Sequence, residues 1–131
     1  MTEVGAYTST SGTIAATGAF VTTLTGDATA LSVTLQTGTS ALITMSSTAT
    51  HSVVGQGITQ SVSVSGATTL AASVANGTAH TYATASGSTP LMRTILLTGL
   101  TGGTNTFTLN YLAGAATATM TNRALTVKGV A

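Results

Sequence analysis

The chain has 131 residues, only 4% of them are charged, and its formal net charge is +1. Soluble monomers usually carry about a quarter charged residues, so this chain either relies on hydroxyl groups for solubility or has its surface covered in an assembly. Its three cations cannot neutralise a run of phosphates. No stretch approaches the roughly 18 consecutive apolar residues of a membrane span. We therefore expect neither nucleic acid nor a membrane as a partner.

Residues 1–18 are small and polar and show no sustained periodicity, which is typical of an extended arm or linker. An arm rich in Gly, Ser and Thr becomes ordered only when something holds it. It could clasp a neighbouring subunit or form a first strand in the domain's own sheet, and the sequence leaves both open. We therefore divide the chain into an N-terminal arm, 1–18, and one β-sandwich domain, 19–131.

From residue 19 onward, short β-type runs alternate with turn signals. Roughly a quarter of the chain is Thr, whose branched Cβ favours extended backbone while its hydroxyl tolerates water. Leu31, Val33 and Leu35 alternate with hydroxyl residues, the period-two pattern of a half-buried strand. The expected strands, in chain order, are 19–25, 31–35, 41–47, 58–64, 68–73, 80–85, 91–98, 107–111, 116–121 and 124–127.

The spacing of these runs indicates the architecture. Short strands separated by turns at intervals of about 8–12 residues indicate a sandwich or barrel, and no window shows a helical apolar stripe. We predict an all-β fold: a single antiparallel β-sandwich, jelly-roll-like, with an immunoglobulin-like sandwich as the second choice.

Catalytic and metal-binding groups are scarce. The only carboxyl pair consists of Glu3, in the arm, and Asp27, in a predicted turn, which does not favour glycosidic cleavage. A Ser-His-Asp arrangement could be assembled from Asp27, His51 or His80 and one of many Ser residues, but no G-x-S-x-G nucleophile motif accompanies it. No acidic residue or Cys lies near either histidine in the sequence to complete a metal shell. We expect no enzyme activity, no cofactor and no metal. The two histidines could still bind a metal if they met at a symmetry axis.

Association is the stronger expectation from composition. Chains with little charge tend to associate, and edge strands are normally guarded by Lys or Pro, of which this chain has one each. Arg93 shares a predicted face with Leu91 and Ile95 and could reach solvent or a partner's carboxylate. Tyr7 and Tyr82 could anchor an interface or stack on sugars. Tyr111 alternates with apolar residues and is predicted to lie in the core.

Two further features bear on where the protein is made. The first five residues lack the basic and apolar stretches of a signal peptide. Cysteine is absent, so no disulfide indicates an oxidising compartment. We therefore expect synthesis in the cytoplasm.

Four blocks of sequence carry a family resemblance: GTSAL (38–42), VSGATTLAAS (64–73), RTILLTGLTGGTNTFTLNY (93–111) and NRALTV (122–127). In order and spacing they resemble a module of tailed-bacteriophage virion proteins. This module is the small jelly-roll-type β-sandwich found in capsid decoration (cement) proteins and in tail or fibre appendages. The similarity extends from about Gln36 to Lys128. After Tyr111, however, Leu112 and Ala113 stand where polar or basic residues are expected.

The resemblance implies a structural role rather than catalysis. It matches Arg93 and Arg123 to positions that are often basic, so it implies a structural role for them in strand pairing or in contacts between subunits. Tyr7 lies outside the matched region and is a further candidate for a subunit contact. It implies the capsid surface of a virion as the location and the major capsid protein as a partner. A homotrimer, which would fit local three-fold sites, is favoured over a dimer. Because the chain is nearly all module, we expect a decoration protein that bridges capsid subunits, with a glycan-binding tail or fibre module as the alternative.

Overall fold

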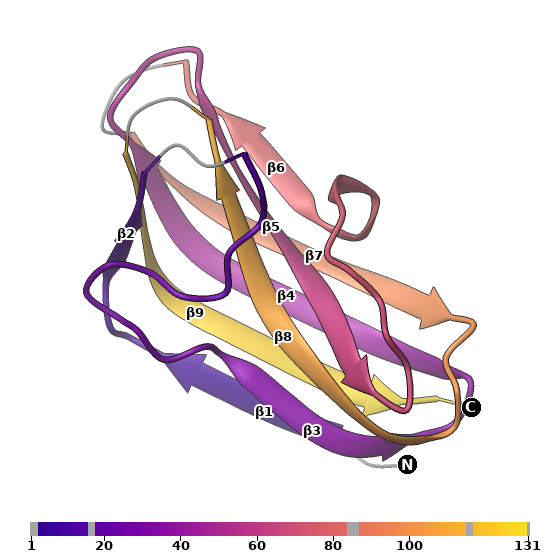
Figure 1. Cartoon of the computed structure of the whole chain (residues 1–131). Helices are drawn as coiled ribbons and strands as arrows, with labels where there is room; N and C mark the ends of the chain where they lie inside the picture. Colours follow the sequence, from indigo (N-terminus) through magenta and orange to yellow (C-terminus); the bar gives the residue numbers. More distant parts are fainter. Residues whose placement is uncertain (1–2, 16–17, 84–86, 115–116, 131) are drawn as a thin grey trace.

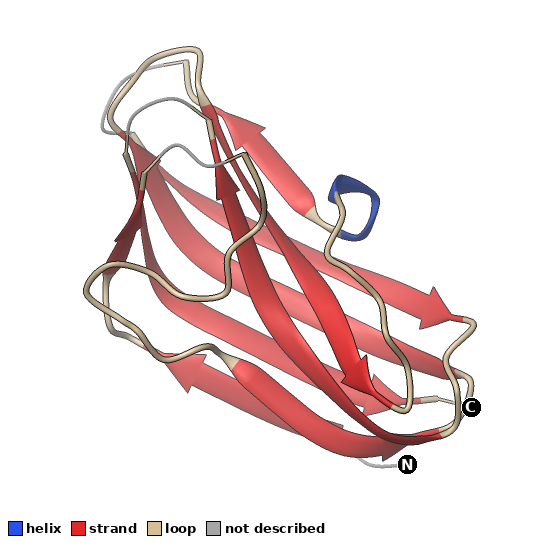
Figure 2. Ribbon diagram, in the orientation of Figure 1, coloured by secondary structure: helices blue, strands red, loops and turns tan. Residues whose placement is uncertain are grey.

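Two antiparallel sheets lie face to face in the computed structural model, which describes residues 3–15, 18–83, 87–114 and 117–130 (Figures 1 and 2). The first sheet has the order β1 (Glu3–Thr8), β9 (Ala118–Gly129), β4 (Ser40–His51), β7 (Ser88–Thr98), with β2 (Gly12–Ile14) also paired to β9. The second has the order β3 (Ser32–Thr37), β8 (Gly103–Ala113), β5 (Gly57–Gly66), β6 (Thr78–Thr81). A 3₁₀ turn, η1 (Val74–Asn76), precedes β6.

The strand pairs are nested along the chain. Both β1 and β2 pair with β9, β3 pairs with β8, β4 with β7, and β5 with β6, all antiparallel. A long antiparallel ribbon rolled into two packed sheets in this way is a jelly roll. The predicted fold class is therefore confirmed, and the jelly roll is chosen over the immunoglobulin-like alternative.

The N-terminal segment belongs to the sandwich. β1 runs along β9 with Glu3 opposite Lys128, and β2 pairs with the other half of β9. Of the two roles left open for the arm, its described residues have the second, a strand in the domain's own sheet. Residues 1–2 and 16–17 of the predicted arm, 84–85 of the predicted strand 80–85, and 116 of the predicted strand 116–121 lie outside the described residues.

Two predicted strands are loops. Segment 19–25 makes only isolated bridges, one of them from Val21 to Tyr111, because the chain here crosses from the first sheet to the second. Segment 68–73 makes one bridge, from Leu70 to Val64. The Asn105 side chain accepts the Thr68 N–H at 2.7 Å, so a side chain takes the place of a ladder partner.

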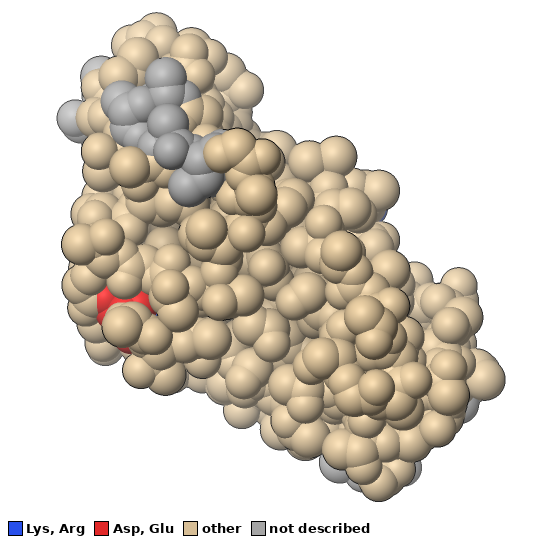
Figure 3. Space-filling view, viewed as in Figure 1, with Lys and Arg blue, Asp and Glu red and all other residues tan. Residues whose placement is uncertain are grey.

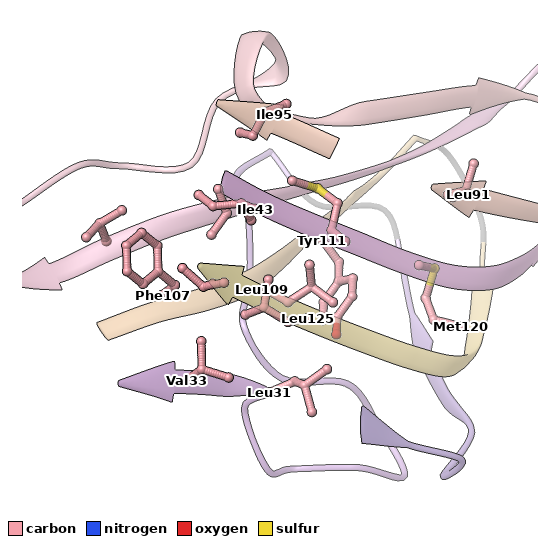
Figure 4. Packing of buried hydrophobic residues seen from close by; sticks show 14 of the residues in the cluster. Leu31, Val33, Ile43, Leu91, Ile95, Phe107, Leu109, Tyr111, Met120 and Leu125 are labelled. Atoms are coloured by element: carbon pink, nitrogen blue, oxygen red, sulfur yellow. The ribbon is translucent and has the colours of Figure 1, made fainter. Parts of the chain in front are cut away.

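The core fills the space between the two sheets. Phe107 and Leu109 of β8 face Ile43 of β4 and Leu125 of β9 across it (Figure 4). Alternate residues of β3, β4 and β8 are buried, which is the period-two pattern predicted from the sequence. Tyr111 is fully buried among them, as predicted.

β9 contains a β-bulge where the sequence predicts a break between two strands. Its register against β4 shifts between Ser46 and Thr48, so that Ser47 is opposed by two residues, Asn122 and Arg123. Asn122 has φ +48°, in the left-handed region that Asn tolerates better than most residues. The buried positions of β9 are even-numbered before the bulge and odd-numbered after it. The extra residue therefore keeps both halves facing the core, because a shift of one residue reverses the faces of a strand.

The bulge also places Arg123 inside the sandwich. Its side chain is fully buried, forms an ion pair with Asp27, and donates from Nη1 to the Tyr111 hydroxyl at 2.9 Å. A buried cation requires such partners. Asp27 lies at the turn predicted from the sequence, and its carboxylate is bound by Arg123. Arg123 is fully buried and so does not lie on a surface where it could contact another subunit, which corrects the contact role that the resemblance implied.

A second polar contact joins the sheets through the core. Gln60 of β5 is fully buried, accepts the Ser47 hydroxyl at 2.8 Å and donates to the Leu91 carbonyl at 3.1 Å. One side chain of the second sheet thus binds two strands of the first. Together with the Arg123–Tyr111 contact, it fixes how the sheets lie on each other.

The ion pair predicts a large effect of a small substitution. Asp27→Asn keeps the shape of the side chain but leaves the buried Arg123 charge without a counterion, so we expect a loss of about 3 kcal/mol of unfolding free energy. The double variant Asp27→Asn/Arg123→Met, which removes the charge too, should recover much of the loss. Urea unfolding measures both. A loss below about 0.5 kcal/mol for Asp27→Asn would show that the pair is not a structural determinant.

The buried tyrosines predict alkaline destabilisation. Burial raises the pKa of Tyr111 above its usual value of 10.0, against a lowering effect of the Arg123 hydrogen bond, and burial also raises the pKa of Tyr82. The unfolded chain therefore loses these phenol protons first as pH rises. Stability is fully present below pH 10 and decreases above it, as pH approaches the folded pKa values.

Urea unfolding at pH 8 and pH 11, values chosen on either side of the usual tyrosine pKa of about 10, tests this expectation. Tyr82→Phe should reduce the difference in unfolding free energy between the two pH values. Tyr111→Phe should reduce it too, although it also removes the acceptor of the Arg123 hydrogen bond. Equal stability of the unsubstituted chain at both pH values would contradict the expectation.

Candidate functional site

The outward side of the first sheet forms a regular surface across four strands. Within β1, β9, β4 and β7, the residues that alternate with the buried ones point away from the core. The strand registers align them in rows across the sheet. We call this surface the neutral face; its rows are Glu3–Lys128–Leu42–Leu96, Gly5–Thr126–Thr44–Thr94 and Tyr7–Ala124–Ser46–Met92.

Hydroxyl and apolar groups dominate the neutral face. Glu3 and Lys128, of opposite charge, stand opposite each other at one end, and the other members of the three rows are uncharged. Thr44 and Thr94 hydrogen-bond each other at 3.0 Å, so these hydroxyls already have a partner within the sheet. Met92 and Leu96 are 70% and 59% exposed. The surface is thus nearly uncharged and partly apolar.

The opposite side of the molecule is also poor in charge. Seen from the side on which β8 passes in front of β4 and β9, the surface shows one acidic patch and no basic atoms (Figures 1 and 3). Its hydroxyls pair in the same way, as in Thr34 with Thr106 at 2.7 Å. Large exposed apolar side chains are nevertheless concentrated on the neutral face, because Leu42, Met92 and Leu96 all belong to it.

Two of the predicted contact residues have local partners. Tyr7 lies on the neutral face, 64% exposed, and its hydroxyl donates to the Asn122 side chain at 3.1 Å. Arg93 points to the inner side of β7, at the edge of the sheet, and donates to the carbonyls of Ala75 and Gly77. It thereby ties β7 of the first sheet to the η1–β6 segment of the second. The sequence indicated the orientation of Arg93 but not these acceptors.

The two histidines meet at one tyrosine, a contact for which the sequence contains no signal. The rings of His51 and His80 lie 6.0 Å and 4.6 Å from the ring of Tyr82, measured between centroids. His51 is buried, and its Nδ1 accepts the Val53 N–H at 3.1 Å, which places the ring proton on Nε2. Nε2 is buried without a hydrogen-bond partner in the described part of the chain.

This cluster does not form a metal centre in the described structure. Among residues 3–15, 18–83, 87–114 and 117–130, no three His, Cys, Asp or Glu side chains gather as metal ligands. A hollow of about 380 Å³ lies beside His51, lined otherwise by hydroxyl residues. Its walls could offer hydrogen bonds to a small polar ligand, but no carboxylate lines it. The other lining residues are Thr50, Ser52, Thr117 and Thr119.

In the same described ranges, no helix has the length and apolar character needed to cross a membrane.

No protein-family model and no curated protein matches the chain. Solved structures do match it. A chain of infectious bursal disease virus, Gx strain, has TM-score 0.61 at 15% identity, covering 96% of this chain and 32% of that one. A chain of the VP2 subviral particle of infectious bursal disease virus has TM-score 0.63 at 14% identity, covering 95% and 32%. Eiger TNF from S. frugiperda has TM-score 0.60 at 10% identity, covering 98% and 93%.

These comparisons concern the fold. The chain spans about a third of the length of the virus chains it matches. Identities of 10% to 15% show a common architecture and not a common activity. The chain therefore shares its jelly-roll fold with chains of virus particles and with a TNF protein.

Proposed function

We propose that the chain is a structural virion protein, a capsid decoration or cement protein that binds the outer surface of a phage capsid and bridges major capsid protein subunits. The observation that carries this proposal is the neutral face. Its rows cover four strands of one sheet, with a single pair of opposite charges at one end. Support also comes from the phage-module resemblance and from the jelly-roll fold shared with chains of virus particles.

The chemistry of the neutral face suits contact with another protein. The centres of protein interfaces are depleted in charged residues and enriched in Met and aromatic side chains. Met92 and Tyr7 are exposed on this face beside Leu42 and Leu96. Because Thr44 and Thr94 hydrogen-bond each other, covering them leaves fewer hydroxyl groups without a partner. The cost of removing water from this face is therefore low.

The mechanism of cementing is mechanical. A protein that binds two capsid subunits at once stabilises the assembled shell, because its binding free energy is gained only when both are in place. Small contacts become strong when several are made by one rigid body. The jelly roll supplies that rigidity, since Gln60 and Arg123 fix the two sheets on each other. No reaction, cofactor or nucleic acid has a part in this mechanism.

A particle-binding experiment tests the proposal. Thr44→Lys places an unpaired charge at the centre of the neutral face, and we expect it to weaken binding to capsids that lack the protein by at least about tenfold. Thr106→Lys is the matched control, because Thr106 is also half-buried and also pairs with a threonine of an edge strand, but in the other sheet. Cosedimentation with the particles measures both.

The control should bind within about twofold of the unsubstituted chain, since a surface substitution away from the contact usually changes free energies by less than about 0.5 kcal/mol. The unsubstituted chain should also raise the temperature at which the capsid disassembles. Equal binding by both variants would exclude the neutral face. Absence of any binding to the capsid would exclude the cement role.

The hydroxyl-lined hollow favours a second candidate, a tail or fibre module that binds host-surface glycans. Its volume of about 380 Å³ and its threonine and serine lining suit a sugar residue. In this case the isolated chain should bind host polysaccharide, and Thr119→Phe, which narrows the hollow, should abolish binding while Thr44→Lys leaves it unchanged. Calorimetric titration with the polysaccharide checks this. Binding that survives Thr119→Phe would place the sugar elsewhere.

A further inference from the structure

We propose that β7 pairs with β7 of a second copy of this chain, antiparallel, around a two-fold axis at Thr94. The starting observation is the exposed edge of the first sheet. β7 has 11 residues and forms one edge of that sheet, whereas β6, at the same side of the second sheet, has four. The other two edges, β1 and β3, lie against each other (Figure 1). β7 is therefore the longest edge available to another strand.

The backbone groups that face this edge can be identified. In an antiparallel sheet the N–H and C=O of one residue point to the same neighbour, and successive residues alternate. The backbone carbonyl of Ser40 accepts the Val130 N–H at 3.1 Å. The backbone N–H of Ser52, which is also even-numbered and directly follows β4, donates to the Thr117 carbonyl at 3.0 Å. The backbone N–H and C=O groups of even-numbered residues of β4 therefore point to β9. The backbone N–H and C=O groups of odd-numbered residues of β4 then point to β7.

The register between β4 and β7 shows which backbone groups of β7 point to the free edge. Ile43 is opposite Ile95 in β7, so the backbone N–H and C=O groups of odd-numbered residues of β7 point to β4. The backbone groups of Met92, Thr94 and Leu96 consequently point away from the sheet. No backbone hydrogen bond outside the strand ladders involves them in the described chain. They form a row of donors and acceptors that another strand could pair with.

In the described chain, the usual protections of an edge strand are missing from the central part of β7, residues 92–96. Edges are guarded by charged side chains, Pro or covering segments. Pro90 interrupts only the beginning of β7. The side chain of Arg93 is turned to the carbonyls of Ala75 and Gly77 and so does not extend along the edge.

The edge is complementary to itself, which is why the occupant is a second copy. In an antiparallel pair centred on Thr94, Met92 of one copy is opposite Leu96 of the other, and Thr94 is opposite Thr94. All three have edge-facing backbone groups, so each pair can exchange both of its hydrogen bonds. The side chains of Met92 and Leu96, 70% and 59% exposed, would then cover each other. Apolar and Thr–Thr cross-strand pairs are among the favourable ones.

This pairing would join two neutral faces into one continuous surface. A contact between identical edges is isologous and closes after two copies, so it gives a dimer and not a fibre. The proposal does not depend on the cement role, because it concerns the purified chain alone. It replaces the homotrimer expected from the sequence with a dimer.

Cysteine cross-linking tests the register, because the chain has no cysteine of its own. Thr94→Cys places two thiols opposite each other at about 5.5 Å between Cα atoms, within the range of a disulfide. On oxidation we expect a covalent dimer of twice 12.7 kDa on a non-reducing gel. Met92→Cys alone should not cross-link, but a mixture of Met92→Cys and Leu96→Cys should.

A charge substitution tests the contact itself. Thr94→Lys places two like charges opposite each other, so we expect the dimer to weaken by at least about tenfold in sedimentation experiments. Thr34→Lys is the matched control, since Thr34 is also exposed, also on an edge strand and also hydrogen-bonded to a threonine of the neighbouring strand. The control should dimerise like the unsubstituted chain, and urea unfolding of both variants confirms that they fold.

Three results would overturn the proposal: a monomer or trimer of the unsubstituted chain, cross-linking of Met92→Cys alone in place of Thr94→Cys, or a dimer that Thr94→Lys and Thr34→Lys affect equally. A monomer that binds capsids would leave the proposed function standing while this inference fails. A dimer that does not bind capsids would support this inference while the proposed function fails.

Discussion

The bulge at Asn122 and Arg123 is the constraint on which the sandwich depends. β9 pairs with β4 along its length and with β1 and β2 on its other side, so it is the central strand of the first sheet. The extra residue lets both halves of β9 bury their apolar side chains. It also directs Arg123 inward, where Asp27 and Tyr111 bind it. One irregular position thereby sets the core, the crossing loop that carries Asp27 and the contact between sheets.

The placement of the charged residues explains the surface. Asp27 and Arg123 neutralise each other inside the protein, and Arg93 is engaged with two carbonyls. Glu3 and Lys128 face each other at one end of the neutral face. Charge is thus used within the fold, and the outer faces are left to hydroxyl and apolar groups. Such surfaces are suited to being covered by protein, which is the physical basis for proposing a role in a virion.

Sequence periodicity predicts the part of the fold that depends on alternation. Val33 and Leu35 of β3 are buried as expected, and so is Tyr111. Periodicity cannot predict contacts set by topology: Asp27 and Arg123 are far apart in sequence, and only the crossing between sheets brings them together. The pattern at Asn122 predicts the end of a strand, because a bulge and a turn have the same local signal. The neutral face is likewise invisible in the sequence, since its rows require the registers of three strand pairs.

Cryo-electron microscopy of the phage particle that is proposed to carry this protein tests the central claim most directly. The account predicts density for the jelly roll repeated across the icosahedral shell, with the neutral face toward the capsid and each copy touching more than one major capsid subunit. A bare shell with the chain only at the tail would contradict the cement role. Density on the shell with the neutral face exposed to solvent would contradict the docking surface.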